Sequence, residues 1–388
     1  MAIEREVDDA QKQLELGYAL EQQGKLEEAA AKYREATRIA PEGAQAHAYL
    51  GAVLSRLGKF DEAITELRTV TRLAPSDSRS QVNLGYALGW NGMLDEATNV
   101  LRAAVRLAPN YVQAHLYLAD TLSRQRKYGE AIAALHDVVR LEPANAEIRM
   151  RLCAALESDG KLDQAQDAIR EAIRLQPENA RARLLLGQVL HSAGKRAETM
   201  AAIRESIRLA PKDAQGYVFL GAVLGELNQT DEAIQALREA IRLKPDDAIA
   251  HINLGYCLIK LGKFNEGLNE IREAARLDPT NARAHAYLGY ALRRAGKLAD
   301  SAASYREAVR LAPEEPVHHF DLAFARQGFG DWNGAVNAYR EAIRLKPDYA
   351  EAYYNLGIAL QTQGKLDEAK EAFDAAKRLD PRYDPPPR

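Results

Sequence analysis

Eleven prolines recur at a constant spacing of 34 residues along this chain of 388 residues. No insertion or deletion interrupts the series of Pro41, Pro75, Pro109, Pro143, Pro177, Pro211, Pro245, Pro279, Pro313, Pro347 and Pro381. A fixed period of this size indicates stacked copies of one small motif, each too small to bury its own hydrophobic face. We therefore expect one elongated repeat structure rather than two or three separate globular domains.

Alignment on these prolines, with Ala10 as position 1, divides residues 10–383 into eleven repeats. Position 8 is glycine, alanine or cysteine in every repeat, so two helices can approach closely there. Position 29, three residues before the proline, is always arginine, from Arg38 to Arg378. Position 7 is always leucine, at Leu16, Leu50, Leu84, Leu118, Leu152, Leu186, Leu220, Leu254, Leu288, Leu322 and Leu356.

Each repeat has the hydrophobic period of a helix twice. In the second repeat, Leu50 and Leu54 and then residues 63, 67 and 70 are apolar, at steps of three and four. Gly58 breaks the pattern between the two stretches, and Pro75 prevents the second helix from continuing. We expect helix, turn, helix, turn in every repeat, and no strand.

These positions together resemble the tetratricopeptide repeat: a leucine followed by a small residue, a later small and apolar stripe, and a closing proline. The resemblance covers residues 10–383. It implies an all-α fold, a right-handed superhelical α-solenoid of antiparallel helix pairs whose first helices line a concave groove. Pentatricopeptide repeats, which bind RNA, are similar but have a longer period, so the constant spacing argues against them.

The segments outside the repeats are short. Residues 1–9 are predicted to be an N-terminal capping segment, and residues 384–388 a short proline-rich tail. In the last repeat, Lys370 and Lys377 replace residues that are usually apolar, so the final helix is expected to cap the array with charge. The alternative is that these lysines reflect drift in a truncated array.

Composition excludes several classes of protein. The chain has 52 Lys+Arg against 55 Asp+Glu and a net charge of -3, without the basic excess of most nucleic-acid binders. Cys153 and Cys257 are too few for a disulfide framework. The acidic start lacks the apolar core of a signal peptide, and no apolar run approaches the ~18 residues of a membrane helix. We expect a cytoplasmic protein without membrane contact.

No catalytic or cofactor-binding motif is present. Histidine occupies position 4 in five repeats, at His47, His115, His251, His285 and His319. Successive copies should lie about 10 Å apart, too far to share a metal ion with bonds of about 2 Å. The repeated Gly-Lys turn lacks the other residues of a phosphate loop, and no Gly-x-Ser-x-Gly occurs. We predict no enzyme activity and no cofactor.

The resemblance places positions 2, 6, 9, 12 and 13 on the concave face. Two stretches there carry the aromatic, Asn and Arg side chains that favour protein interfaces and peptide backbones. The N-terminal groove set is Tyr49, Asn83, Tyr86, Trp90 and Tyr117, flanked by Arg56, Arg79 and Arg124. The C-terminal groove set is Asn253, Tyr256, Arg283, Tyr287, Tyr290, Arg293 and Arg294, flanked by Phe219, Lys260 and Phe324. The alternative is that these tyrosines only pack helices together.

Three functions remain open from the sequence. The favoured one is a protein–protein interaction scaffold that binds extended peptides or partner segments in the concave groove. A self-assembling structural solenoid is the second, and an RNA or anionic-polymer binder, using Lys260 and the arginines of the C-terminal groove set, is the third. The carboxylate clamp of chaperone-binding family members is not predicted, because the neighbours of Asn83, Asn253 and Asn355 lack its lysines.

The sixth and seventh repeats depart most from the pattern. Arg196 and Thr199 replace the usual apolar and small residues, and residues 228–230 replace the usual Gly-Lys-Leu turn. We expect this segment to be a weaker seam, with faster hydrogen exchange over residues 194–232.

Overall fold

The structure is a computed structural model that describes residues 2–383, and residues 2–7 by their backbone alone. The predicted tail 384–388 therefore lies outside the described residues, as do the first seven side chains of the predicted capping segment. The backbone of residues 2–9 belongs to the first helix, α1, which continues to Gln22.

The described residues form 22 helices and no strand, two helices per repeat. The predicted all-α class and the helix–turn–helix repeat are thereby confirmed. The helices are α1 Ala2–Gln22, α2 Leu26–Ile39, α3 Ala44–Arg56, α4 Phe60–Leu73, α5 Ser78–Trp90, α6 Leu94–Leu107, α7 Val112–Arg124, α8 Tyr128–Leu141, α9 Ala146–Ser158, α10 Leu162–Leu175, α11 Ala180–Ser192, α12 Arg196–Leu209, α13 Ala214–Glu226, α14 Thr230–Leu243, α15 Ala248–Lys260, α16 Phe264–Leu277, α17 Ala282–Arg294, α18 Leu298–Leu311, α19 Pro316–Gly328, α20 Trp332–Leu345, α21 Ala350–Thr362 and α22 Leu366–Leu379.

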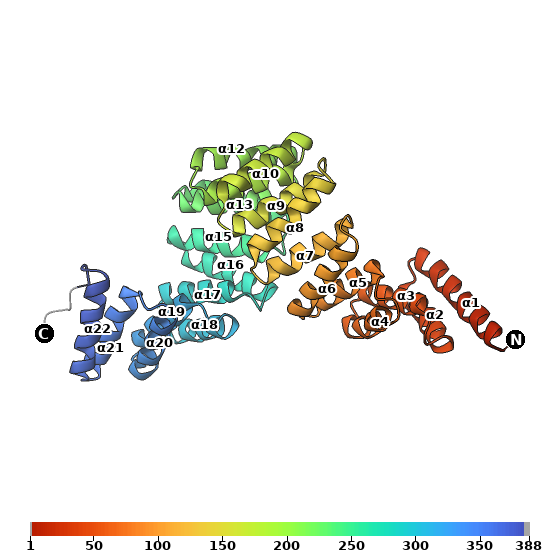
Figure 1. Ribbon diagram of the computed structural model, residues 1–388. Coiled ribbons are helices and arrows are strands. Elements are labelled where there is room, and N and C mark those ends of the chain that lie inside the picture. Colours follow the sequence, from red (N-terminus) through yellow and green to blue (C-terminus); the bar gives the residue numbers. More distant parts are fainter. Residues whose placement is uncertain (1, 384–388) are drawn as a thin grey trace. The chain divides into compact units, whose positions relative to one another are not determined.

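The chain divides into two compact units, Met1–Ala202 and Ile203–Arg388. Within each, the helices follow one another as packed pairs, and each second helix also packs on the next first helix (Figure 1). First helices of neighbouring repeats touch as well: α3 with α5, α5 with α7 and α9 with α11 in one unit, and α13 with α15, α15 with α17 and α19 with α21 in the other. The first helices thus form a layer of their own in each unit.

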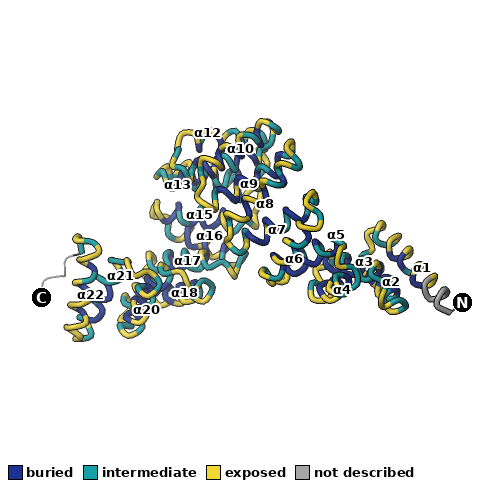
Figure 2. Tube along the Cα trace, in the orientation of Figure 1, coloured by how far each residue is buried: buried dark blue, intermediate teal, exposed yellow. Residues whose placement is uncertain are grey.

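The two helices of a pair meet at position 8. A Cβ on Gly51 would lie 2.5 Å from Cγ of Leu67, inside van der Waals contact, so only a very small residue fits. Ala63, Leu67 and Val70 of α4 are buried almost completely beside it. Figure 2 shows such buried residues recurring between exposed ones along the helices, as amphipathic helices require.

The turn inside each pair needs a residue in the left-handed region of backbone conformation. Nine of the eleven repeats use glycine there, with φ between 72° and 87°. Arg126 and Asn228 occupy the same position in the fourth and seventh repeats with φ of 60°. The short turn reverses the chain, so the two helices pack antiparallel.

Position 4 links each repeat to the proline that ends the preceding one. His47 Nε2 donates to the carbonyl of Pro41 at 2.9 Å, and Gln81 donates to Pro75 in the same way. The other position-4 histidines make the same bond to the proline six residues before them, at Pro109, Pro245, Pro279 and Pro313. These five histidines therefore serve the junctions between repeats.

The invariant arginine at position 29 has a local partner. In eight repeats it pairs with an acidic residue three positions earlier on the same helix, as Arg174 does with Glu171 at 2.6 Å. These pairs are largely exposed, so each adds little to the stability of the fold. The constant place of this arginine in the repeat thus puts an ion pair in the last turn of the second helix.

Candidate protein-binding site

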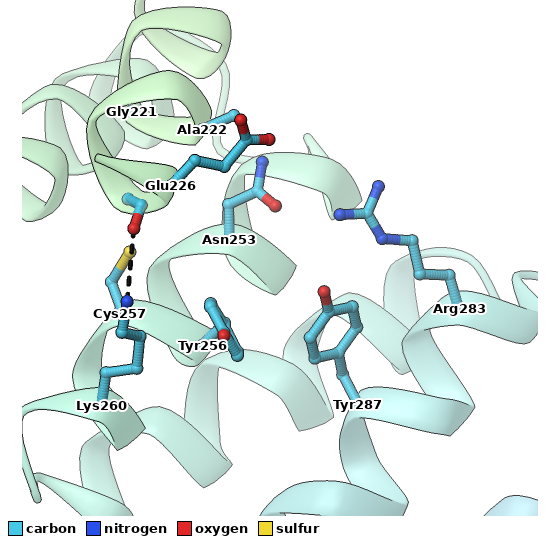
Figure 3. A pocket seen from close by; sticks show the side chains of 10 residues that line it. Gly221, Ala222, Glu226, Asn253, Tyr256, Cys257, Lys260, Arg283 and Tyr287 are labelled. Carbon is cyan, nitrogen blue, oxygen red and sulfur yellow. Dashed lines mark hydrogen bonds between the residues drawn. The ribbon is translucent and has the colours of Figure 1, made fainter. Parts of the chain in front are cut away.

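A pocket of about 230 Å³ opens on the layer of first helices in the C-terminal unit (Figure 3). Its walls come from α13, α15 and α17; α13 contacts α15, and α15 contacts α17. Small residues on α13 leave the space that larger side chains on α15 and α17 surround. The lining residues are Gly221, Ala222, Gly225, Glu226, Asn253, Tyr256, Cys257, Lys260, Arg283 and Tyr287.

Four members of the C-terminal groove set line this pocket: Asn253, Tyr256, Arg283 and Tyr287. Within the part of the chain that the structure describes, the Asn253 amide and both tyrosine hydroxyls make no hydrogen bond. Lys260 Nζ instead donates to the carbonyl of Gly225 and, at 2.8 Å, to Oδ1 of Asn228. The pocket therefore offers an amide and two hydroxyls for hydrogen bonds to a ligand.

The aromatic rings of this set contact one another. The Tyr256 and Tyr287 rings meet edge to face, with centroids 5.5 Å apart, and the Tyr290 ring lies 6.2 Å from Tyr256. Burial raises the pKa of the Tyr256 hydroxyl, so this group stays a neutral hydrogen-bond donor at neutral pH. Tyr290 thus extends the cluster along α17 beyond the pocket itself.

Cations lie over these rings. The Arg283 guanidinium lies 5.5 Å from the centre of the Tyr287 ring, and Arg293 lies over both Tyr290 and Phe324. Arg294 lies over Phe264, the first residue of α16, and so joins the set through that ring instead. Each cation–π contact fixes a charged group at the surface without neutralising it.

The N-terminal groove set forms a second cluster, on α5 and α7. The Tyr86 ring lies 4.8 Å from Tyr117 and 6.2 Å from Trp90. Trp90 is 59% exposed, stacks on Phe60 and carries the Arg124 guanidinium over its ring. This cluster presents a broad aromatic surface.

Tyr49 does not join that cluster. Its ring stacks on Tyr33 of α2, with centroids 5.4 Å apart. Asn83 lies on α5 beside the cluster and makes no hydrogen bond within the described residues. In this set, therefore, Tyr86, Trp90 and Tyr117 come together, while Tyr49 contributes to helix packing.

Two groups of residues at these surfaces were missed from the sequence. Phe60 and Phe264 support Trp90 and Arg294 from position 17, where leucine is the commonest residue. The glycines and Glu226 of α13 line the pocket without being aromatic. The signal that could have identified the second group is Gly225 at position 12, where a missing side chain leaves space on the layer of first helices.

The positions predicted to be concave in the fourth to sixth repeats carry charges of both signs that pair internally. Arg151 lies 3.3 Å from Asp120, and Arg181 lies 3.2 Å from Glu147. These ion pairs join neighbouring first helices, so this stretch offers little unpaired charge to a partner.

The cysteines are poor nucleophiles. Both are free and buried, and burial raises the pKa of Cys153 to about 12. Burial also raises the pKa of Cys257, which borders the pocket. A thiol with a raised pKa carries little of the reactive thiolate at neutral pH. Residues 2–383 also contain no group of three or more His, Cys, Asp or Glu side chains placed to hold a metal ion, and no helix long and apolar enough to cross a membrane.

Comparison with protein families found repeated matches to tetratricopeptide repeat models. These cover residues 17–58 and 330–364, residues 50–112, 84–146 and 154–214, residues 122–174, and residues 350–383. Residues 196–319 match the tetratricopeptide repeat domain of cytochrome c-type biogenesis protein H. A comparison with curated proteins found no match.

Solved structures with a similar fold include two that align over nearly the whole chain. The APC/C hetero-tetramer Cut9–Hcn1 has a TM-score of 0.55 at 14% identity, covering 94% of this chain and 92% of that one. Yeast Tom70 has a TM-score of 0.50 at 14% identity, covering 95% of this chain and 92% of that one. At such identity these likenesses concern the fold alone.

Proposed function

The chain belongs to the tetratricopeptide repeat family, with eleven tandem 34-residue repeats, and we propose that it is an interaction scaffold whose first helices bind extended segments of partner proteins. Family membership supports protein binding in general. The location of the binding surface and the extended form of the partner are the specific content of the proposal.

One observation carries it. In the pocket on α13, α15 and α17, the Asn253 amide and the Tyr256 and Tyr287 hydroxyls surround a cavity of about 230 Å³ and have no hydrogen-bond partner among the described residues. An amide can donate to a peptide carbonyl and accept from the next peptide N–H. Such pairing holds an extended chain by its backbone, and the tyrosine rings supply the apolar contact area that dominates binding energy.

Catalysis is not part of the proposal. Acyl transfer or redox chemistry would need a reactive thiol or an activated hydroxyl, and the two thiols are buried with raised pKa values. The carboxylate clamp is likewise not proposed, because in the sequence around Asn253 only Arg283 matches a position at which the clamp has a cation. The scaffold acts by binding alone and requires no cofactor.

The test is capture of partners from native extract. The wild-type chain, used as bait, is compared with an Asn253→Ala, Tyr287→Phe double variant, which keeps the ring packing but removes two polar contacts. We expect the amount of captured partner to fall roughly tenfold, since each lost hydrogen bond contributes about 0.5–1.5 kcal/mol.

The matched control makes the same two changes elsewhere. Asn269→Ala on α16 and Tyr353→Phe on α21 lie outside the proposed surface, so capture should equal that of the wild type. Equal capture by wild type and groove variant would contradict the proposal, provided thermal unfolding shows that both variants are folded.

The cytoplasmic location remains a prediction. Residues 196–319 match a domain of cytochrome c-type biogenesis protein H, which makes the periplasm the alternative to test. Cell fractionation with an antibody to the chain decides between the two compartments.

A further inference from the structure

We propose that the C-terminal groove set selects an acidic segment, one rich in aspartate and glutamate, from the partner protein. The inference rests on the proposed binding function and adds the chemical class of the ligand. It concerns the surface of α15 and α17 and the pocket beside them.

The charge of these two helices is one-sided. Neither α15 nor α17 contains an aspartate or a glutamate. Together they carry Lys260, Arg283, Arg293 and Arg294 on positions 2, 12 and 13. None of these four cations forms an ion pair with any described residue, although the charge of Arg293 acts on the Asp321 carboxyl and opposes the rise in its pKa that burial causes. The result is a surface with several uncompensated positive charges.

The cations are held in place before any ligand arrives. Lys260 lies over Tyr256, Arg283 over Tyr287 and Arg293 over Tyr290, with distances to the ring centres of 5.8, 5.5 and 5.5 Å. A guanidinium resting on a ring loses less conformational freedom on binding than a free one. Its N–H groups remain available at the ring edge for a carboxylate.

The same contacts favour a peptide over RNA. Binding of single-stranded RNA depends on aromatic faces on which bases can stack. Here cations cover one face of these rings, and Tyr256 and Tyr287 meet edge to face 5.5 Å apart, which leaves no parallel slot for a base. A carboxylate needs only the N–H groups of the cations, which the rings do not cover, so an acidic peptide can bind here.

The pocket also restricts where the acidic side chain lies. Figure 3 shows the Asn253 amide, in that view, between Glu226 of α13 and Arg283 of α17. The Arg283 guanidinium lies at the α17 side of the pocket and can pair with a carboxylate, so the ligand's carboxylate belongs there. The Asn253 amide then pairs with the backbone of the same segment.

The N-terminal groove set lacks this property. Position 2 of the repeat after Asn83 is Gln113, where the repeat after Asn253 has Arg283. Two first-helix arginines in that unit pair with carboxylates, Arg56 with Glu21 and Arg151 with Asp120, while Arg124 lies over the Trp90 ring. The selectivity for acidic segments is therefore strongest at the C-terminal set, which has the larger number of cations without an ion pair among the described residues.

The test selects ligands from a phage-displayed library of random peptides on the immobilised full chain. Peptides retained by the wild type should contain roughly twice the Asp and Glu of the unselected library. The excess should disappear in the double variant Arg283→Gln, Arg294→Gln. The first of these changes introduces the residue that Gln113 provides at the same repeat position in the N-terminal unit. The control Arg272→Gln, Arg306→Gln removes two exposed cations from α16 and α18 and should keep the excess.

A second measurement gives the size of the effect. A selected acidic peptide, labelled with fluorescein, should bind the groove variant about tenfold more weakly than the wild type, which is about 1.4 kcal/mol. Retained peptides without acidic excess, or an excess that survives the groove variant, overturn the inference while leaving peptide binding intact. Retention of no peptide at all counts against the proposed function itself. An oligouridylate serves as competitor for the labelled acidic peptide. If it displaces that peptide at a lower concentration than the unlabelled peptide does, the surface binds RNA instead.

Discussion

At the scale of single residues, Asp321 on the first helix α19 has a carboxyl group with a strongly shifted pKa. It lies at position 6 of the tenth repeat, and burial raises its pKa to about 6. Arg293 opposes this shift by favouring the charged form, while Glu351 adds to it. The native state therefore holds this proton more tightly than the unfolded chain does.

Replacement of Asp321 should make stability less dependent on pH. Because the native pKa of about 6 exceeds the ordinary value of 3.8, the unfolding free energy falls as pH rises between these values. Asp321→Asn should raise the unfolding free energy above pH 7 by about 1–3 kcal/mol and change it little below about pH 4. Urea unfolding at both pH values measures the difference.

The exposed Asp374→Asn on α22 is the control for that experiment. It makes the same chemical change without burial and should show no gain above pH 7. A gain for Asp321→Asn that is equal at both pH values would contradict the assignment, since the gain would then not come from the proton.

Arg126 holds a backbone conformation that other repeats give to glycine. With φ of 60°, an ordinary L-residue is strained by about 1–2 kcal/mol. Arg126→Gly should therefore raise the unfolding free energy by about 0.5–1 kcal/mol after the entropy of glycine in the unfolded chain is subtracted. Thermal or urea unfolding measures this gain.

Asn228 provides the comparison, because asparagine tolerates the same conformation better. Asn228→Gly also removes the acceptor for Lys260, so it should bring no gain. If the two glycine variants gained equally, relief of strain at Arg126 would not be the cause.

At the scale of elements, α5 contains a glycine that packing requires and one that it does not. A Cβ on Gly85 would lie 2.7 Å from Cδ2 of Leu101 on α6, whereas one on Gly89 would find its nearest atom, Oγ1 of Thr121, at 3.6 Å. Gly85→Ala should lower the unfolding free energy by about 1–3 kcal/mol through overpacking. Gly89→Ala should raise it by about 0.5–1 kcal/mol through helix propensity.

Urea unfolding of the two variants on the same helix tests this pair. The direction of the difference is the result that matters, because both variants change glycine to alanine within four residues. Equal losses would mean that helix pairing in α5 and α6 does not depend on the close approach at position 8.

The helices themselves were predictable because particular residue types set where each one begins and ends. Proline follows each second helix, and glycine turns nine of the eleven pairs, so the period alone predicted both helices of a repeat. The orientation of individual rings was not predictable. Tyr49 and Tyr86 both belong to concave positions, but Tyr49 stacks on Tyr33, which replaces the leucine or isoleucine of most repeats at position 24. Ring placement depends on the size of a neighbour one repeat away.

The pocket was predictable only in part for the same reason. Asn253, Tyr256, Arg283 and Tyr287 follow from their positions in the repeat. The space they surround depends on side chains that are missing, above all at Gly225, and a search for chemistry-bearing residues passes over glycine. The positive charge of this surface was also recognisable only once the helices were assigned. Neither α15 nor α17 contains an acidic residue, whereas the chain as a whole has a net charge of -3.

At the scale of the whole molecule, the division between the two compact units falls inside α12, between Ala202 and Ile203. This lies within the segment 194–232 that departs most from the repeat pattern. Thr199 is completely buried where most repeats have alanine, and its hydroxyl donates to the Lys195 carbonyl of its own helix. A buried hydroxyl bonded in this way adds little to the packing between helices.

Hydrogen exchange should therefore be faster over residues 194–232 than over the second to fourth repeats, residues 44–145. Fewer apolar contacts lower the free energy of local opening there. Mass spectrometry of exchanged peptides measures the contrast. Uniform protection along the chain would refute the prediction.

The bond between position 4 and the preceding proline carbonyl has a consequence for how such a chain changes length. Histidine, glutamine, arginine and tyrosine all serve as its donor, at His47, Gln81, Arg149 and Tyr217. The acceptor is a backbone atom, which every repeat supplies alike. Recombination that adds or removes 34 residues, wherever it begins, therefore rejoins a competent donor to an equivalent acceptor. Loss of a single residue disturbs the repeat in which it occurs, whereas a change of a whole period leaves every donor six residues after its acceptor, so gene duplication in whole periods is the least disruptive route to a new length.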